Sequence, residues 1–170
     1  MRILDFTRVL SGPFATMMLG DLGAEVTKIE PPNGDESRSW PPILKNGVSA
    51  YFLALNRNKR SIALNLKEER AKNIVLKLAA ETYVVVENFT PGVVAKLGID
   101  YETLKKVNPK IIYCAISGFG QDGPYRNKKA YDPIVQGMTG LMSITGERNG
   151  PPAKIGIPIT DLTAASHAVT

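Results

Sequence analysis

The residue best placed to carry out chemistry in this sequence is Asp161. It follows an extended apolar stretch with isoleucines at positions 155, 157 and 159, and it precedes a predicted helix from Leu162 to Thr170. The local pattern favours a helix N-cap at Asp161, because a carboxylate there accepts free backbone N–H groups. The same N–H groups and the helix dipole would keep the carboxylate ionised, as a nucleophile requires. The two interpretations are compatible.

Two other segments are candidates for binding an anionic ligand. The run from Asn56 to Arg60, followed by Lys67, concentrates positive charge beside a predicted sheet edge. The run could bind nucleotide phosphates, or it could be a solvated loop without a ligand, and spacing alone does not decide between these two interpretations. Asn88 and Phe89 follow a predicted strand, where Phe89 could stack on a base. The local pattern there favours a simple helix start, with Thr90 as the N-cap.

A dinucleotide-binding fingerprint is not present after the first predicted strand. The stretch from Ser11 to Thr16 holds one glycine, Gly12, of the three that the fingerprint needs, and Pro13 removes a backbone N–H. Glu30 ends the second predicted strand, where an acid would contact a ribose, but it is interpreted as a solvated strand end. The sequence therefore argues against NAD(P) as the ligand.

Composition excludes several other classes of function. The net charge is +5, without a dense basic run, which suits an anionic small ligand and predicts no nucleic-acid partner. The single cysteine, Cys114, indicates a reducing compartment, and we expect a cytoplasmic location. The single histidine, His167, rules out a multi-histidine metal site, so no metal is predicted. No apolar run is long enough to cross a bilayer, which predicts no membrane partner.

The first thirty residues predict the unit that positions these side chains. Residues 2–6 and 24–30 are expected to be strands, joined by a helix that begins at Pro13 and ends near Gly23. The residues expected on its buried face are Phe14, Met17, Met18 and Leu22. Such a crossover makes the two strands parallel neighbours, with ligands bound outside their carboxyl ends.

The rest of the chain continues the alternation of strands and helices. Further strands are predicted at 60–66, 82–87 and 110–117, and helices at 49–55, 68–81, 91–97, 100–107 and 131–144. A long loop at 31–47 carries Trp40 as an expected packing anchor. The predicted fold class is α/β, with an open, mostly parallel Rossmann-like sheet and helices on both faces.

Several motifs in this order resemble those of the family III CoA-transferases. This superfamily includes formyl-CoA transferase, carnitine CoA-transferase and the α-methylacyl-CoA racemases. The matching segments run through the whole chain: LDFTRVLSGP at 4–13, LGAEVTKIE at 22–30, NRNKRSI at 56–62, VENFTPG at 86–92, SGFGQDGP at 117–124 and GLMSITG at 140–146.

The resemblance implies a mechanism and a set of site residues. Asp161 matches the family's catalytic aspartate, which attacks an acyl-CoA thioester to give an anhydride and then an aspartyl-CoA thioester. Coenzyme A is then a substrate, and no cofactor is held covalently. The positions that match CoA contacts are Val9, Leu10, Leu64, Lys67, Asn88, Phe89, Lys96, Lys129 and Tyr131. With this resemblance we favour the ligand-binding interpretation of the basic run and of Asn88 and Phe89.

Two positions bear on the choice of reaction. The related racemases carry a histidine base where this chain has Tyr131, and a tyrosine with a pKa of about 10 is a poor base at neutral pH. Leu10 stands where formyl-CoA transferase has a glutamine, which argues against the same small substrate. The expected reaction is CoA transfer from an acyl-CoA donor to a carboxylic acid, in the style of the dicarboxylate transferases. An acyl-CoA racemase is the alternative.

Family members are more than twice as long as these 170 residues. The resemblance implies that residues 1–170 form the N-terminal part of the CoA-binding large domain, and that the small domain and the returning C-terminal segment are absent. It also implies an interlocked homodimer in full-length relatives. A truncated CoA-binding fragment without turnover is therefore a further alternative.

Overall fold

A parallel sheet lies at the centre of the molecule. The structure is a computed structural model that describes residues 1–170. The five strands are β1 (Arg2–Asp5), β2 (Glu25–Glu30), β3 (Lys59–Ala63), β4 (Val84–Glu87) and β5 (Ile112–Ala115). They lie in the order β3-β2-β1-β4-β5, and every neighbouring pair is parallel. The predicted α/β class and Rossmann-like sheet are confirmed.

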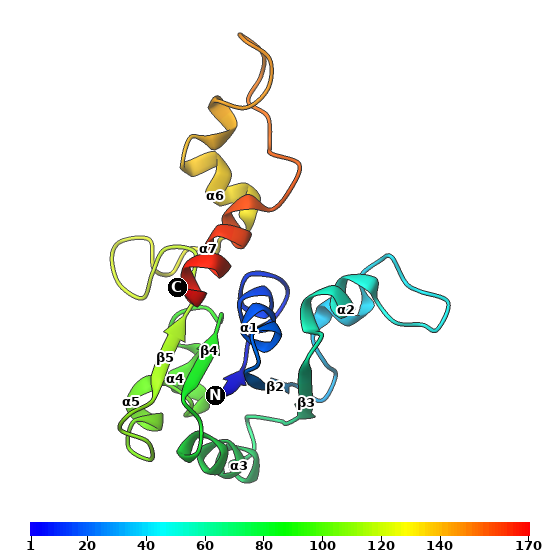
Figure 1. Ribbon diagram of the computed structural model, residues 1–170. Helices are drawn as coiled ribbons and strands as arrows, with labels where there is room; N and C mark the ends of the chain where they lie inside the picture. Colours follow the sequence, from blue (N-terminus) through cyan, green and yellow to red (C-terminus); the bar gives the residue numbers. More distant parts are fainter.

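Helices cover both faces of this sheet (Figure 1). The α-helices are α1 (Ser11–Asp21), α2 (Ala50–Asn56), α3 (Glu69–Ala80), α4 (Val93–Leu97), α5 (Tyr101–Leu104), α6 (Asp132–Met138) and α7 (Ile159–Val169), and η1 (Glu36–Ser39) and η2 (Leu141–Ser143) are 3-10 helices. On one face, Leu4, Ile29 and Val85 pack against α3, α4 and α5 in the main apolar core. On the other face, Ile3 and Val26 lie beneath α1 in a smaller cluster.

Helix α1 buries mostly small side chains. The prediction that four large apolar residues form its buried face is wrong. Leu22 is 79 % exposed and forms the C-cap, and of the four predicted residues only Met17 is buried. Gly12, Ala15 and Gly20 are buried instead. A Cβ on Gly12 would lie 2.2 Å from Cγ2 of Thr7, so the start of α1 approaches the preceding loop too closely for a side chain. Periodicity finds large apolar residues and misses a helix packed through small ones.

Charged side chains fill part of the space between α1 and the sheet. Asp5, at the end of β1, is fully buried and forms an ion pair with Lys59, whose Nζ lies 2.9 Å from Asp5 Oδ2. Lys28 Nζ pairs with Asp35 at 3.0 Å. Although burial opposes it, the positive charges of Lys59 and Lys28 hold the pKa of Asp5 below its ordinary value. Breaking a buried ion pair leaves an uncompensated buried charge, which is strongly destabilising. These pairs therefore hold the end of β1 in place beneath α1.

The basic run from Asn56 to Arg60 leads into β3 and takes part in this scaffold. Residues that precede a parallel strand lie at the amino edge of the sheet, opposite the edge where ligands bind. Arg57 and Asn58 both contact Asp21 of α1, and Lys59 turns inward to Asp5. These three side chains are therefore used within the protein, and phosphate binding by the run stays a prediction.

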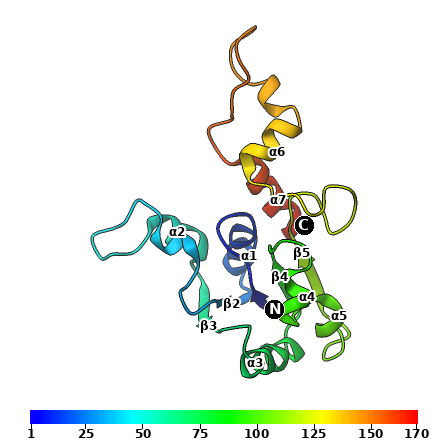
Figure 2. The same ribbon diagram turned by 180° about the vertical axis from the view of Figure 1, so that it is seen from behind.

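The region after β5 departs from the predicted single helix at 131–144. Helix α6 ends at Met138, and the separate helix η2 begins at Leu141. Gly140 between them has a φ of +82°, a left-handed conformation that ends the helix. Figures 1 and 2 show α6 and the loop that follows it extending away from the sheet before α7 returns to pack against α1.

Candidate active site

The carboxyl ends of β1 and β4 form the switch point of the sheet. The chain leaves β1 toward β2 on one side and leaves β4 toward β5 on the other, so the two loops diverge and open a crevice. A cavity of about 370 Å³ lies there, and its walls come from both loops, from the glycine-rich loop after β5, and from α6 and α7. The fold therefore places the candidate site where parallel α/β sheets bind ligands.

Seven of the ten predicted site residues line this cavity: Val9, Leu10, Asn88, Phe89, Lys129, Tyr131 and Asp161. The structure does not place the other three in its wall. Leu64 packs against the main apolar core. Lys67, in the loop between β3 and α3, and Lys96, on α4, are both exposed. Contacts from these three to a ligand remain predictions.

Asp161 lies in the first turn of α7, and the interpretation of it as the N-cap is wrong. Helix α7 begins at Ile159 after Pro158, and neither residue supplies a capping side chain. The carboxylate of Asp132 does this instead, because its Oδ1 accepts Thr160 N at 2.9 Å and Thr160 Oγ1 at 2.7 Å. The Asp161 side chain is thus free of a capping role and faces the cavity wall.

The surroundings of Asp161 favour its neutral form more than the sequence suggested. Burial, together with the negative charge of Asp132, raises the pKa of Asp161 to about 6. We expected the helix start to favour the ionised carboxylate, but burial and the charge of Asp132 outweigh any such effect here. The group is mostly ionised at neutral pH, and its raised pKa indicates a more basic carboxylate than one in water.

The aromatic pair of Tyr51 and Trp40 was not among the predicted site residues. Burial and the charges of Asp161 and Asp35 raise the pKa of Tyr51 to about 12, which places this phenol within electrostatic reach of Asp161. The rings of Trp40 and Tyr51 lie 5.4 Å apart. Trp40 was predicted as a packing anchor, and its partner lies on α2. Nothing in the local sequence pattern connects Tyr51 with Asp161.

Four cationic side chains line the same cavity: Arg8, Arg126, Lys128 and Lys129. None of them forms an ion pair with a protein carboxylate. Arg126 and Lys128 were missed by the sequence interpretation, although both follow closely on the SGFGQDGP motif at 117–124. Four unpaired cations in one cavity attract an anionic ligand with several charges.

Glu87, the last residue of β4, is a buried carboxylate beside this cavity. It is 2 % exposed, and its Oε2 accepts the backbone N–H of Phe89 at 2.7 Å. Burial raises its pKa to about 7, and the single hydrogen bond only partly opposes this. Glu87 thus fixes the loop that presents Phe89.

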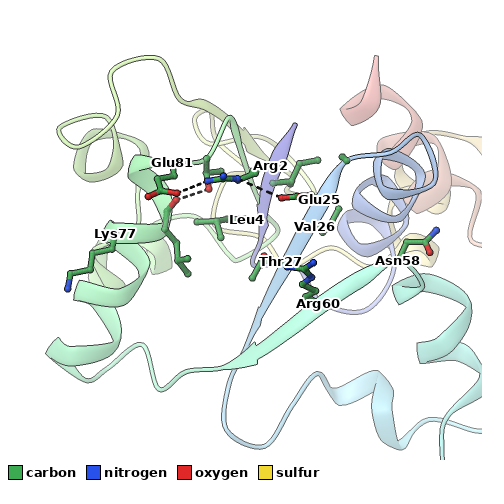
Figure 3. A pocket seen from close by; sticks show the side chains of 13 residues that line it. Arg2, Leu4, Glu25, Val26, Thr27, Asn58, Arg60, Lys77 and Glu81 are labelled. Atoms are coloured by element: carbon green, nitrogen blue, oxygen red, sulfur yellow. Dashed lines mark hydrogen bonds and ion pairs between the residues drawn. The ribbon is translucent and has the colours of Figure 1, made fainter.

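A second hollow of about 400 Å³ lies at the opposite edge of the sheet (Figure 3). Its wall includes the first residues of β1 and β2. Figure 3 shows Arg2 directed at Glu81 and Glu25, with which it pairs. Arg2, Glu25 and Glu81 therefore pair with one another, whereas Arg60 and Lys77 in the same wall have no ion-pair partner, and Asp161 does not line this hollow. We do not assign it chemistry.

Neither a metal centre nor a membrane span is found in the structure. No group of three or more histidine, cysteine, aspartate or glutamate side chains is arranged to hold a metal ion. The helices are all too short or too polar to cross a bilayer.

The sheet order, the switch-point cavity and its unpaired cations define an α/β protein of the nucleotide-binding type, with a half-buried carboxylate as candidate nucleophile. Comparison with known proteins identifies the family. The chain belongs to CoA-transferase family III, which it matches over residues 1–170. The resemblance noted in the sequence is confirmed.

Individual relatives agree with this assignment. The chain is 53 % identical over 168 residues to succinyl-CoA:glutarate CoA-transferase of Mus musculus, covering 98 % of this chain and 38 % of that protein. It is 48 % identical to formyl-CoA:oxalate CoA-transferase of Streptomyces avermitilis, over 99 % of this chain and 41 % of that protein. The crystal structure of a CAIB/BAIF family protein from Brucella suis superimposes with a TM-score of 0.91 at 42 % identity, covering 99 % of this chain and 48 % of that one. The chain thus spans about two-fifths of the length of the curated relatives it matches.

Proposed function

We propose that this chain forms the CoA-binding and nucleophilic part of an enzyme that moves CoA from an acyl-CoA donor to a carboxylic acid. The observation that carries the proposal is that Asp161 and four unpaired cations line one cavity. The cations suit the phosphates of a CoA thioester, and the carboxylate suits attack on its carbonyl carbon.

The proposed reaction passes through a covalent intermediate on Asp161. A carboxylate oxygen of Asp161 bonds to the thioester carbonyl carbon, the C–S bond breaks, and CoA leaves as the thiolate. The thiolate then attacks the aspartyl carbonyl of the resulting anhydride, which gives an aspartyl-CoA thioester and releases the donor acid. The acceptor carboxylate repeats both steps in reverse. A pKa of about 6 leaves Asp161 ionised at neutral pH, as the first step requires.

The names of the relatives support a proposal for the acceptor class. Several of them are named for transfer to glutarate or oxalate, both of which are dicarboxylates. We therefore propose a dicarboxylate as the acceptor. A racemase is less well supported, because Tyr131, at the position of the racemase base, is a tyrosine and is 70 % exposed. A CoA-binding piece without turnover remains the alternative for residues 1–170 alone.

Calorimetric titration with CoA and with NADH tests the ligand. We expect CoA to bind and NADH to give no signal. Clear NADH binding without a CoA signal would contradict the proposal.

A pair of matched double variants tests the site. Arg126→Ala with Lys129→Ala removes two cations from the cavity wall, whereas Arg60→Ala with Lys77→Ala removes two from the hollow at the other edge. The first pair should weaken CoA binding about tenfold or more, with a smaller dependence on salt. The second pair should leave binding unchanged, and equal losses in both would place the phosphates elsewhere.

A further inference from the structure

Val9 has an unusual backbone conformation in the loop between β1 and α1. Its φ is +68°, whereas the other non-glycine residues with positive φ are asparagines, Asn58 and Asn149. A β-branched residue rarely adopts this left-handed conformation, because its side chain crowds the backbone. Such strain persists only where neighbouring contacts fix the chain. Val9 lines the switch-point cavity, so the strain lies in the wall of the candidate site.

The side chain of Asn88 holds the residue that precedes Val9. Arg8 N donates to Asn88 Oδ1 at 2.8 Å, and Asn88 Nδ2 donates to the Arg8 carbonyl oxygen at 2.8 Å. Both polar atoms of the amide are therefore used on one backbone residue. A side-chain amide pairs with a peptide group here in the way that two peptide groups pair in a sheet.

This pairing extends the ladder between β1 and β4 past the point where the strands separate. Phe6 N donates to Val86 O at 2.9 Å, and two residues further along each chain Arg8 faces Asn88. The backbones diverge at the switch point, so a peptide group of β4 does not satisfy Arg8. The amide of Asn88 bridges that gap.

Other contacts fix the same loop on both sides of Arg8 and Val9, because Leu10 O accepts Phe14 N at 2.8 Å at the start of α1. Thr7 N donates to Asp5 Oδ1 at 2.9 Å, and Lys28 Nζ donates to Thr7 O at 2.7 Å. Beyond Thr7, the guanidinium of Arg8 lies 5.0 Å from the centre of the Phe89 ring, a contact that also depends on the loop carrying Asn88. Asn88 is thus the hydrogen-bonding anchor of the residue before Val9, whereas the first turn of α1 holds the residue after it.

We propose that Asn88 is a positioning residue, which holds Val9 in its left-handed conformation through the backbone of Arg8 and so preforms the wall of the ligand site. This differs from the expected role of Asn88 as a direct contact of CoA. The proposal rests on the proposed function only for the identity of the ligand.

Amide hydrogen exchange in the ligand-free, full-length protein tests the clamp itself. Asn88→Ala should make the Arg8 amide exchange about tenfold faster or more, because its acceptor is lost, and Val9 should follow. Asn88→Asp is the second variant, for use if the alanine variant folds poorly. It keeps an acceptor for Arg8 N, but its carboxylate repels the Arg8 carbonyl oxygen, so the Arg8 and Val9 amides should again exchange faster. An Arg8 amide that stays protected in both variants would overturn the proposal.

A double-mutant cycle on CoA binding tests the link to Val9. Glycine adopts a positive φ without strain, so Val9→Gly removes the need for the clamp. Asn88→Ala should weaken CoA binding about tenfold in the parent protein but less than about threefold in the Val9→Gly background. An equal loss in both backgrounds would mean that Asn88 contacts the ligand directly, and would overturn the proposal.

Asn46→Ala is the matched control, because Asn46 makes one backbone contact, to Val48 N, in an exposed loop. It should leave both measurements unchanged. If the parent protein does not bind CoA at all, the proposed function fails, and the exchange measurement alone decides the role of Asn88.

Discussion

Asp132 and Asp161 lie on different helices, yet the carboxylate of Asp132 organises the helix start from which Asp161 projects. Asp132 is 5 % exposed, and it accepts hydrogen bonds from Thr160 and from Gln136 Nε2 at 2.6 Å. Although burial opposes it, these bonds hold the pKa of Asp132 below its ordinary value. Asp132 therefore stays ionised, and its charge contributes to the raised pKa of Asp161.

Asp132→Asn should lower the pKa of Asp161. The amide oxygen can still accept the Thr160 hydrogen bonds, so the helix start is kept while the negative charge is removed. The pKa of Asp161 should fall from about 6 but stay above its ordinary value, because burial is its larger cause. Carboxyl carbon NMR against pH measures this, with Asp122→Asn in an exposed loop as the control. An unchanged pKa would show that the charge of Asp132 is screened.

The raised pKa of Glu87 predicts that the stability of the protein depends on pH near neutrality. Its folded pKa of about 7 lies above that of an unfolded glutamate, so the folded protein holds the proton more tightly. The stability from this group is complete below about pH 4.5 and is lost as the pH rises through 7. Glu87→Gln resembles the protonated form and can still accept Phe89 N. At pH 8 the variant should be more stable than the parent by on the order of 2 kcal/mol.

Urea denaturation at pH 5 and pH 8 measures this difference. The two proteins should differ little at pH 5, where Glu87 is protonated. A constant difference at both pH values would assign the effect to packing rather than to ionisation.

Gly118 sets the distance between the end of β5 and the loop that carries Lys129 and Tyr131. A Cβ on Gly118 would lie 2.1 Å from the Cβ of Ala130. Gly118→Ala should therefore displace this wall of the cavity and weaken CoA binding by about tenfold or more, at a stability cost of about 1–3 kcal/mol. Gly156→Ala is the matched control, since nothing lies within 4 Å of its Cβ position. Equal CoA affinity in both variants would contradict a role for this contact.

The fold could be predicted from the sequence because strand and helix patterns alternate clearly. In such sheets, ligands bind outside the carboxyl ends of the strands, which gave the expected position of the site. Asp161 was singled out from its local pattern and from the family resemblance, and the structure places it in the cavity wall. The role of Asp132 did not, since its partner Thr160 lies 28 residues away along the chain. The internal partners of the basic run from Asn56 to Arg60 were also not predicted, because charge density alone does not reveal buried partners such as Asp5.

The prediction of the buried face of α1 failed for a related reason. Most of its buried residues are small, including Gly12, Ala15 and Gly20, and such residues carry little signal in a hydrophobic pattern. The clamp between Asn88 and Arg8 joins residues 80 apart, which pattern analysis cannot pair. Distant polar contacts thus account for most of what the sequence did not reveal.

Asp161→Asn should separate the stability of the site from its chemistry. The raised pKa of Asp161 means that its ionised form destabilises the fold, and this cost appears as the pH rises from about 4 to 6. The side chain is only half-buried, so solvent screening reduces the effect. Asp161→Asn should therefore be more stable than the parent by about 1 kcal/mol at pH 7.5 and equal to it near pH 4. Asp161→Ala should not lose a helix cap, because Asp132 supplies it.

In the full-length enzyme, both Asp161 variants should bind CoA and lose transferase activity, because neither an amide nor a methyl group can form the anhydride. Hydroxylamine added during turnover should convert Asp161 of the parent enzyme to a hydroxamate, which mass spectrometry detects as a modified peptide. The asparagine variant should stay unmodified under the same conditions. Substantial transfer by Asp161→Asn, or a hydroxamate on a different residue, would place the covalent step elsewhere and leave Asp161 with only a role in shaping the cavity.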